Sequence, residues 1–468
     1  MLLLWSTQAG AHGFGQRYEL PVPLSLFLAS AGLVVLLSFV ALAAFPRFAA
    51  AKHDYPRFDL RSTSFGRMLS SSIVRFVLRL AGLFIYLLVI VAGLAGAQSA
   101  LKNIAPVMVW AIAWVGLAYA AAFAGNVWAL LNPFETSFAW LEELYAAVRP
   151  GHRLSLELPY PPRLGVWPAV ALFLGFVWME LIWESADAPA SLAAAILAYS
   201  AITWLGMQVF GREQWLRRGE VFSVVYGYLA RFAPLEGRTV DAKREWNLRP
   251  YAVGLLDRGP AHPSEIVLVL LMLAAVSFDG FLDTPAWAEI VEHLGPDRAV
   301  MRTIGLVAAW LLFVGVYLLT CAAIVRLGSS SLAAPSPGRA AGLFILTLLP
   351  ITIAYHVAHY LSFFAMAGQY LVPLASDPLG RGWDLFGGAR YFIRIAVIDA
   401  RMLWYVSVTA IVAGHIAAVY LAHAVALREF PDRRRALRSQ YPMVALMVAY
   451  TMTSLWIIAQ PIVTAAAR

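Results

Sequence analysis

The sequence predicts an all-α fold, a polytopic transmembrane helical bundle of about ten spans with both termini on the outer side. Hydrophobic residues make up 61% of the 468 residues and charged residues only 13%, about half the charged share of a soluble domain. The apolar residues fall in uncharged runs of about 20 residues, enough to cross a bilayer. The basic residues are concentrated on one side of these runs. This composition excludes a cytosolic enzyme, a secreted domain and a disordered chain.

The predicted spans follow one another along a single membrane domain that covers residues 12–468. They lie near 23–45, 74–97, 105–124, 164–184, 190–210, 264–282, 303–325, 340–366, 402–427 and 441–463. In span eight, Pro350 removes a backbone hydrogen bond and predicts a kink. The segments 134–148 and 215–232 combine apolar and polar residues, and we expect them to lie in the inner interface.

The charge distribution predicts the orientation. The chain carries a net charge of +8, and 26 of its 35 Lys and Arg residues fall between the spans on one side. The positive-inside rule places that side in the cytoplasm, with the N-terminus and the C-terminus outside. Because membrane insertion accounts for the basic residues, we expect lipid rather than nucleic acid as a partner. The predicted location is a plasma membrane, the inner membrane of a bacterium.

The first eleven residues have two interpretations. Residues 1–11 are apolar and end in Ala9-Gly10-Ala11, a small-residue pattern of the kind that signal peptidase cleaves, but they have no basic start. They are either the remnant of a signal peptide or a hydrophobic extension. If cleavage follows Ala11, His12 becomes the N-terminus, and its amine and imidazole could chelate copper.

Ionisable residues inside the predicted spans are the candidates for function, because they are costly in a bilayer. They cluster in spans four, six, eight and nine, and comprise Glu180, Glu184, Asp187, Asp279, Asp283, His356, His359, His415 and His423. Helix rise along each span places Glu180, Asp279, His356, His359 and His415 at mid-membrane or in the outer half. One outward-opening polar cavity could gather these five. Glu184, Asp187 and Asp283 would mark wet helix ends, and His423 would lie near the inner interface.

The histidines allow several interpretations. His356 and His359 are three residues apart and share a helix face, and His415 lies at a similar depth. The three could bind a divalent metal ion, two of them could ligate haem, or all could simply make interhelical hydrogen bonds. Cys321 is the only cysteine, which excludes a disulfide within the chain and a zinc site built from cysteines.

Four segments resemble a family of bacterial multipass membrane proteins identified as fenitrothion hydrolases. The matching segments are residues 11–24 (AHGFGQRYELPVPL), 355–360 (YHVAHY), 376–378 (SDP) and 382–387 (GWDLFG). The resemblance extends over the whole chain and implies hydrolysis of an organophosphorus triester at the inner membrane. It carries over no catalytic residue.

The residues are compatible with that chemistry. A metal held by His356, His359 and His415 could activate water and polarise the phosphoryl oxygen. Glu180 and Asp279 would be the catalytic carboxylates, with Glu180 as general base, and a small apolar substrate could enter from the lipid or the outer face. The sequence therefore favours a metal-assisted hydrolase. Two alternatives remain open: a transporter or channel in which the same residues carry protons or metal ions, and a membrane subunit that anchors a partner protein.

Overall fold

The computed structural model describes residues 18–44, 55–240, 243–257, 259–295, 297–328, 335–394, 397–430 and 432–464. Within these ranges, ten helical segments are long and apolar enough to cross a membrane, so the predicted all-α multipass bundle is confirmed. Eight spans contain one α-helix each: α1 (Leu24–Ala44), α3 (Ser72–Ala95), α8 (Trp167–Leu181, with the preceding η5 turn in the span Pro162–Leu181), α9 (Pro189–Phe210), α12 (Pro263–Phe281), α14 (Arg298–Gly328), α18 (Ala400–Glu429) and α19 (Arg433–Ile462). Residues 1–11 and His12 lie outside the described residues.

Two spans are composite. The third consists of α4 (Ile104–Pro106), a π-helical segment η4 (Val107–Gly116) and α5 (Leu117–Phe123). The eighth consists of α15 (Pro337–Phe344), a 3₁₀ turn η7 (Ile345–Leu348), α16 (Leu349–Ala367), η8 (Gly368–Tyr370) and α17 (Leu371–Ser376). The 3₁₀ turn comes directly before Pro350, where the sequence predicted a kink.

The shorter elements connect the spans on both sides. They are β1 (Tyr18–Glu19), β2 (Phe58–Asp59), η2 (Leu60–Ser62), α2 (Ser64–Leu69), η3 (Ala100–Lys102), α6 (Trp128–Leu131), α7 (Pro133–Val148), η5 (Pro162–Leu164), α10 (Arg212–Arg218), α11 (Val221–Leu229), β3 (Leu235–Val240), β4 (Lys243–Leu248), η6 (Val253–Leu255), α13 (Pro285–Leu294) and β5 (Val463–Thr464). Strand β1 pairs in parallel with β5, with Tyr18 opposite Val463. Both described ends of the chain therefore lie on one side, as the charge count predicted.

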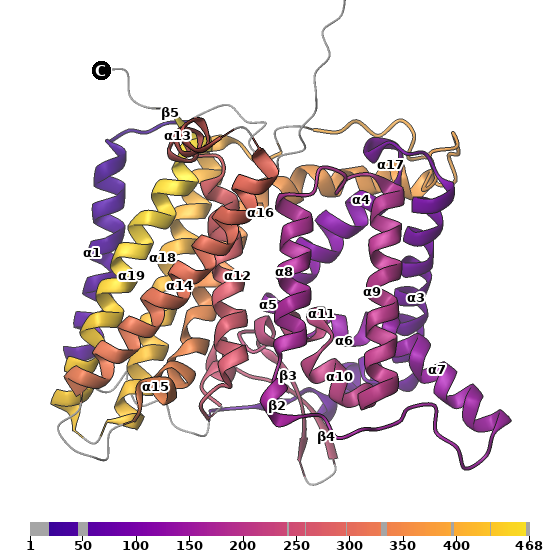
Figure 1. Cartoon of the computed structure of the whole chain (residues 1–468), viewed down its shortest axis with the longest axis horizontal. Coiled ribbons are helices and arrows are strands. Elements are labelled where there is room, and N and C mark those ends of the chain that lie inside the picture. Colours follow the sequence, from indigo (N-terminus) through magenta and orange to yellow (C-terminus); the bar gives the residue numbers. More distant parts are fainter. Residues whose placement is uncertain are drawn as a thin grey trace, which may run out of the picture.

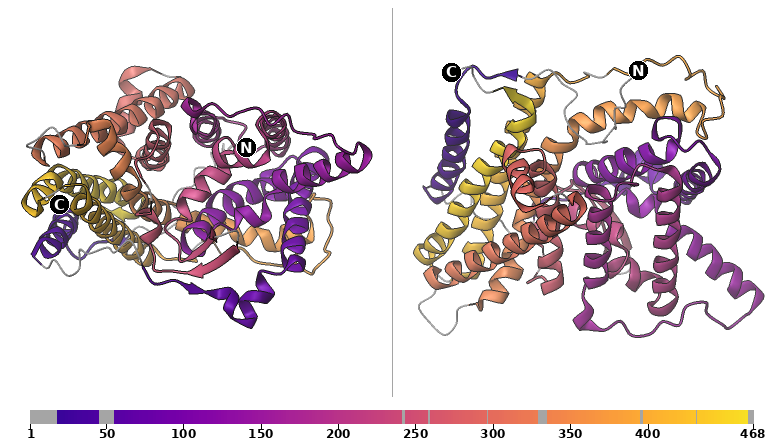
Figure 2. Two further views of the ribbon diagram at one scale, coloured as in Figure 1. Left: turned by 90° about the horizontal axis from the view of Figure 1, so that it is seen from below. Right: turned by 45° about the horizontal axis from the view of Figure 1, so that its top comes forward.

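The spans form two groups that stand side by side (Figure 1). One group consists of α1, α12, α14, α16, α18 and α19, and the other of α3, the third span, α8, α9 and α11. A view turned by 45° also shows α1 against α19 at the edge of the first group (Figure 2). The groups meet where α12 packs against α8 and where α16 packs against η4. This contact between the two groups contains the polar residues discussed below.

The two helices of the first group that form this contact are the most buried spans. In the most apolar windows of α12 and of the eighth span, 89% and 94% of the residues are buried inside the protein. A helix that is apolar on every face can be surrounded by other helices or by lipid, and these two are surrounded mainly by other helices. Helix α18 approaches α16 closely at Gly414. A Cβ atom on this residue would lie 2.5 Å from Ala354 Cβ and 2.7 Å from the Pro350 carbonyl oxygen. Glycine at this position lets α18 fit against α16 and fixes its place.

On the side opposite strands β1 and β5, the chain forms a small antiparallel sheet in the order β2-β4-β3 (Figure 1). Glu236 in β3 accepts hydrogen bonds from Arg57 Nε at 2.9 Å and from Arg249 Nη1 at 2.5 Å. The Arg249 side chain is only 6% exposed. Part of the basic charge that indicated the orientation is thus paired within this sheet.

Segment 215–232 differs from the expectation of an interfacial helix. It divides into α10, which follows α9, and α11, which packs against α5, α8 and α10. In α11, Val221, Val224, Val225, Tyr226, Tyr228 and Leu229 are buried. The apolar residues of α11 therefore contact other helices instead of lipid headgroups.

Candidate functional site

The candidate site lies where the two helix groups meet, and three helices supply its polar side chains. Glu180 stands in the last turn of α8, and Asp279 in the last turn of α12. His359 and Tyr360 come from the middle of α16. The side chains of His359 and Asp279 are each only 7% exposed. The structure thus brings together both carboxylates and one of the histidines that the sequence singled out.

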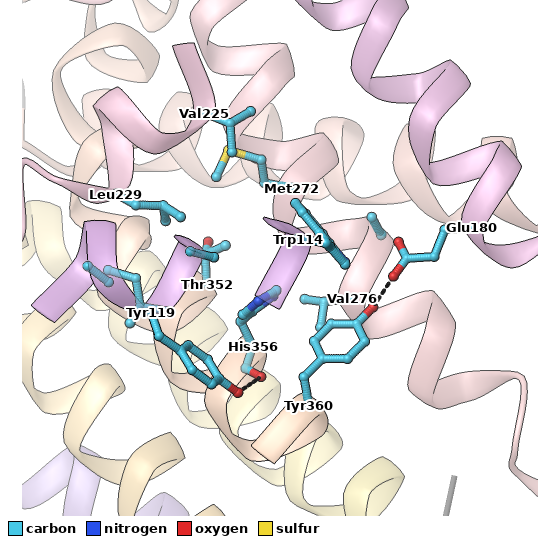
Figure 3. A pocket seen from close by; sticks show the side chains of 14 residues that line it. Trp114, Tyr119, Glu180, Val225, Leu229, Met272, Val276, Thr352, His356 and Tyr360 are labelled. Atoms are coloured by element: carbon cyan, nitrogen blue, oxygen red, sulfur yellow. Dashed lines mark hydrogen bonds between the residues drawn. The ribbon is translucent and has the colours of Figure 1, made fainter. Parts of the chain in front are cut away.

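A chain of hydrogen bonds joins these four residues. His359 Nε2 lies 2.8 Å from Asp279 Oδ2. The Tyr360 hydroxyl lies 2.7 Å from the same Asp279 oxygen and 3.0 Å from Glu180 Oε1, and Figure 3 shows the contact with Glu180. We call Glu180, Tyr360, Asp279 and His359 the carboxyl network.

The geometry of the carboxyl network is suited to a proton on one of its carboxyl groups. Tyr360 has one hydroxyl hydrogen, and an ionised carboxylate can only accept. If both carboxyls are ionised, the hydroxyl donates to one of them or divides its hydrogen between the two in a weaker three-centre bond. If one carboxyl is protonated, it donates to the phenol oxygen, and both short contacts are full hydrogen bonds.

A pocket lies beside the network, and Glu180 and Tyr360 form part of its wall (Figure 3). Its cavity has a volume of about 30 Å³, room for a few water molecules. Most of the lining is apolar, and the polar contributions besides Glu180 and Tyr360 come from Trp114, Tyr119, Thr352 and His356. Trp114 projects from the π-helical segment η4, and π-helical turns are frequent at functional sites.

His356 belongs to this pocket rather than to the carboxyl network. Its ring contacts those of Trp114, Tyr119 and Tyr360, with centroid separations of 5.2, 5.6 and 4.7 Å. His356 is 9% exposed, and its Nε2 atom has no hydrogen-bond partner among the described residues. A buried imidazole nitrogen in this state is costly unless something in the pocket bonds to it.

His415 and His423 lie elsewhere. His415 Nδ1 lies 2.8 Å from the Ile411 carbonyl oxygen, and its ring lies 5.7 Å from that of Tyr450. The rings of Tyr450 and Tyr355 follow one another between His415 and His359. His423 Nδ1 lies 2.8 Å from Gln440 Oε1 on α19, a structural contact as expected.

The structure does not bring the three predicted metal ligands together. No group of three or more His, Cys, Asp or Glu side chains in the described part of the chain is arranged to hold a metal ion. His359 bonds to Asp279, His356 borders the pocket, and His415 lies behind two tyrosine rings. Metal binding by His356, His359 and His415 stays a prediction.

The outer carboxylates lie beyond the helices. Because α8 ends at Leu181 and α12 at Phe281, Glu184 and Asp283 do not continue the helix faces of Glu180 and Asp279, although each lies four residues further along the chain. Both are exposed. Asp187 is half-buried in the turn before α9, and this burial raises the pKa of its carboxyl.

Helix α11 forms the inner boundary of the pocket through Val225 and Leu229. The Tyr226 hydroxyl donates to the Ala113 carbonyl oxygen of η4 at 2.5 Å. At the start of α11, Glu220 is fully buried and accepts hydrogen bonds from Ser223 N at 2.7 Å, Trp128 Nε1 at 3.0 Å, Phe222 N at 3.1 Å and Asn132 Nδ2 at 3.2 Å, and also from the Tyr199 hydroxyl. A carboxylate with so many donors holds α11 in place.

Sequence reasoning did not identify Tyr360, Trp114 or Glu220 as central. Tyr360 follows His359 directly, and an aromatic hydroxyl one residue from a buried imidazole was the available signal. Trp114 and Glu220 had no comparable signal in the sequence, because tryptophan is common in membrane helices and Glu220 stands in a charged connecting segment. No protein-family model, curated protein or solved structure matches the chain, so the function has to be argued from these residues.

Proposed function

We propose that this multipass membrane protein is a proton-coupled transporter, in which the carboxyl network binds the proton and the adjacent pocket binds the solute. The observation that carries the proposal is the position of the Tyr360 hydroxyl between two carboxyl groups, at 2.7 Å and 3.0 Å. Ionisable residues inside membrane domains typically form proton or ion pathways. A buried carboxyl proton has a clear use in transport.

The carboxyl network also crosses the contact between the two helix groups, and a transporter has to rearrange such a contact. Glu180 belongs to one helix group, while Asp279, His359 and Tyr360 belong to the other. If the groups move apart, the hydrogen bond between Tyr360 and Glu180 breaks and the environment of both carboxyls changes. Proton binding and the arrangement of the two groups are therefore linked.

The test measures the proton directly. Protein reconstituted in lipid should show the infrared C=O stretch of a protonated carboxyl at neutral pH, and Glu180→Gln or Asp279→Asn should remove it or shift it. In a weakly buffered suspension of these proteoliposomes with a pH-sensitive dye, a step from alkaline to neutral pH should make the wild type take up about one proton per molecule more than either variant.

The matched control is Glu184→Gln. Glu184 lies only four residues from Glu180 but is exposed beyond the end of α8, so this variant should keep the infrared band and the proton uptake. If the wild type has no protonated carboxyl band and takes up no more protons in the pH step than the two variants, the proposal is wrong. It is also wrong if Glu180→Gln and Glu184→Gln behave alike.

A second candidate is the organophosphorus hydrolase that the resemblance implies, in a bacterial inner membrane. It is favoured by the contact of Glu180 with a pocket whose mostly apolar lining matches the aryl group of such an ester. Purified protein should then release a nitrophenol from fenitrothion, seen by its absorbance, and Glu180→Gln should stop the release. If His356, His359 and His415 bind a metal for this reaction, the active protein should contain it in stoichiometric amounts, and a chelator should abolish turnover. Turnover without metal would contradict the metal-assisted mechanism.

A further inference from the structure

The pocket beside Glu180 combines a carboxyl group with a lining that has no Lys or Arg side chain among the described residues. The carboxyl group forms part of its wall and is joined to a second one through Tyr360. When the shared proton leaves, the negative charge has no cationic side chain in the pocket to balance it. A bound cation would supply that balance.

The aromatic lining favours an organic cation over a metal ion. Trp114, Tyr119 and Tyr360 line the pocket, and aromatic rings attract ammonium groups through their π-electrons. The remaining wall includes Met272 and Val276, which contact apolar substituents and offer no oxygen or nitrogen ligand to a metal ion. An ammonium group with an apolar substituent matches both parts of this surface.

A polar atom without a partner gives independent evidence for a ligand. His356 Nε2 is buried and makes no hydrogen bond within the described residues. In the tautomer that protonates Nδ1, Nε2 can accept a hydrogen bond from an N–H group. An amine that carries N–H groups can therefore satisfy His356, whereas a quaternary ammonium or a hydrocarbon cannot. The cavity of about 30 Å³ has room for a few water molecules, so an amine enters it only when the two helix groups move apart.

We propose that the pocket between Glu180 and His356 binds a small apolar amine in its ammonium form, in exchange for the proton of the carboxyl network. The proposal rests on the function proposed above and names its solute class. One positive charge enters as the ammonium, and one leaves as the carboxyl proton. The buried charge stays balanced throughout, and the exchange makes the protein an amine–proton antiporter.

Benzylamine and benzyl alcohol form a matched pair of probes, since they share a shape and differ in charge at neutral pH. Titration calorimetry on the purified full-length protein should detect benzylamine binding and little or no binding of the alcohol. In buffers that differ in ionisation enthalpy, the heats should show about one proton released per bound amine. Glu180→Gln should weaken benzylamine binding roughly tenfold or more, as expected for the loss of a charged hydrogen bond. Glu184→Gln should leave it unchanged.

A second measurement uses only the wild type and covers the case in which Glu180→Gln does not fold. The titratable groups that face the pocket or join it through the network are Glu180, Asp279, His356 and His359. Each becomes more positive when protonated, so lowering the pH must weaken the binding of a cation. Binding of equal strength across the acidic range would overturn the proposal.

The outcomes separate this inference from the proposed function. If benzyl alcohol binds as tightly as benzylamine, the pocket selects apolar molecules and the inference is wrong. If benzylamine does not bind while the infrared band and the proton uptake persist, the solute class is wrong but the proton-coupled function stands. If binding, band and uptake are all absent, both proposals fail.

Discussion

Replacing Tyr360 with phenylalanine is the most informative single change, because it removes one oxygen atom and keeps the ring. That oxygen makes both contacts between the carboxyl groups, at 2.7 Å to Asp279 and 3.0 Å to Glu180. The Tyr360 ring also packs against His356 and His359, at 4.7 Å in each case, and phenylalanine preserves this packing. Any effect of Tyr360→Phe can therefore be assigned to the lost hydrogen bonds.

The expected loss of stability follows from these two bonds. A hydrogen bond to a charged group contributes about 1.5–3 kcal/mol and a neutral one about 1 kcal/mol. In membrane proteins the values are lower, on average about 0.6 kcal/mol per bond, because the unfolded chain also finds partners in the bilayer. Two bonds of this average strength are worth about 1 kcal/mol, and we expect Tyr360→Phe to lower the free energy of unfolding by about that amount. We also expect the additional proton uptake of the wild type to be lost or to shift in pH, since the carboxyls lose the group that joins them.

Tyr119→Phe is the matched control. Tyr119 also lines the pocket, but its hydroxyl donates only to the His356 carbonyl oxygen, at 3.4 Å. This long bond should be worth about 0.5 kcal/mol or less, and proton uptake should be nearly normal. Denaturant titration in mixed micelles and the dye assay in proteoliposomes measure the two quantities. Equal effects of Tyr360→Phe and Tyr119→Phe would refute the reasoning about the network.

Three further predictions test the fold around the site. Glu220→Gln should lower the free energy of unfolding by about 2–3 kcal/mol, because its new NH₂ group faces hydrogen-bond donors; an unchanged denaturation curve would contradict the role given to this anchor. Gly82→Ala should reduce the folded yield, since its Cβ would lie 1.9 Å from a backbone oxygen of α6, whereas Gly175→Ala, with nothing within 4 Å, should be tolerated. Periplasm-dependent reporters should be active when fused at Gly382 and inactive at Gly237, and the opposite pattern would reverse the orientation.

The arrangement of spans could be predicted because it depends on properties that the sequence states directly. Length and hydropathy define a transmembrane helix, and the ten predicted spans agree closely with those in the structure. The segment 215–232 was placed wrongly at the interface for a related reason. Arg217, Arg218 and Arg231 lie near its ends, while the partners that bury α11, such as the hydrogen-bond donors to Glu220, come from distant segments.

The site was only partly predictable because a sequence gives depth along a helix but not the direction of its neighbours. The depth estimate placed Glu180, Asp279 and His359 at compatible levels, and the structure brings them together. The same estimate included His415, which faces Tyr450 instead. His356 and His359 share a helix face, but this did not give them a common partner. The His356 ring contacts Trp114, while His359 bonds to Asp279.

The position of Tyr360 explains why the proton and the solute are expected to depend on one another. Its hydroxyl makes a hydrogen bond between the two helix groups, and its ring forms part of the pocket wall. An ammonium that replaces the carboxyl proton removes the donor that one of the two short contacts needs. Solute binding must then weaken either the bond to Asp279 within one group or the bond to Glu180 between the groups. In the second case the bound solute loosens the contact between the groups, and this is the step that a transporter requires before it can open to the other side.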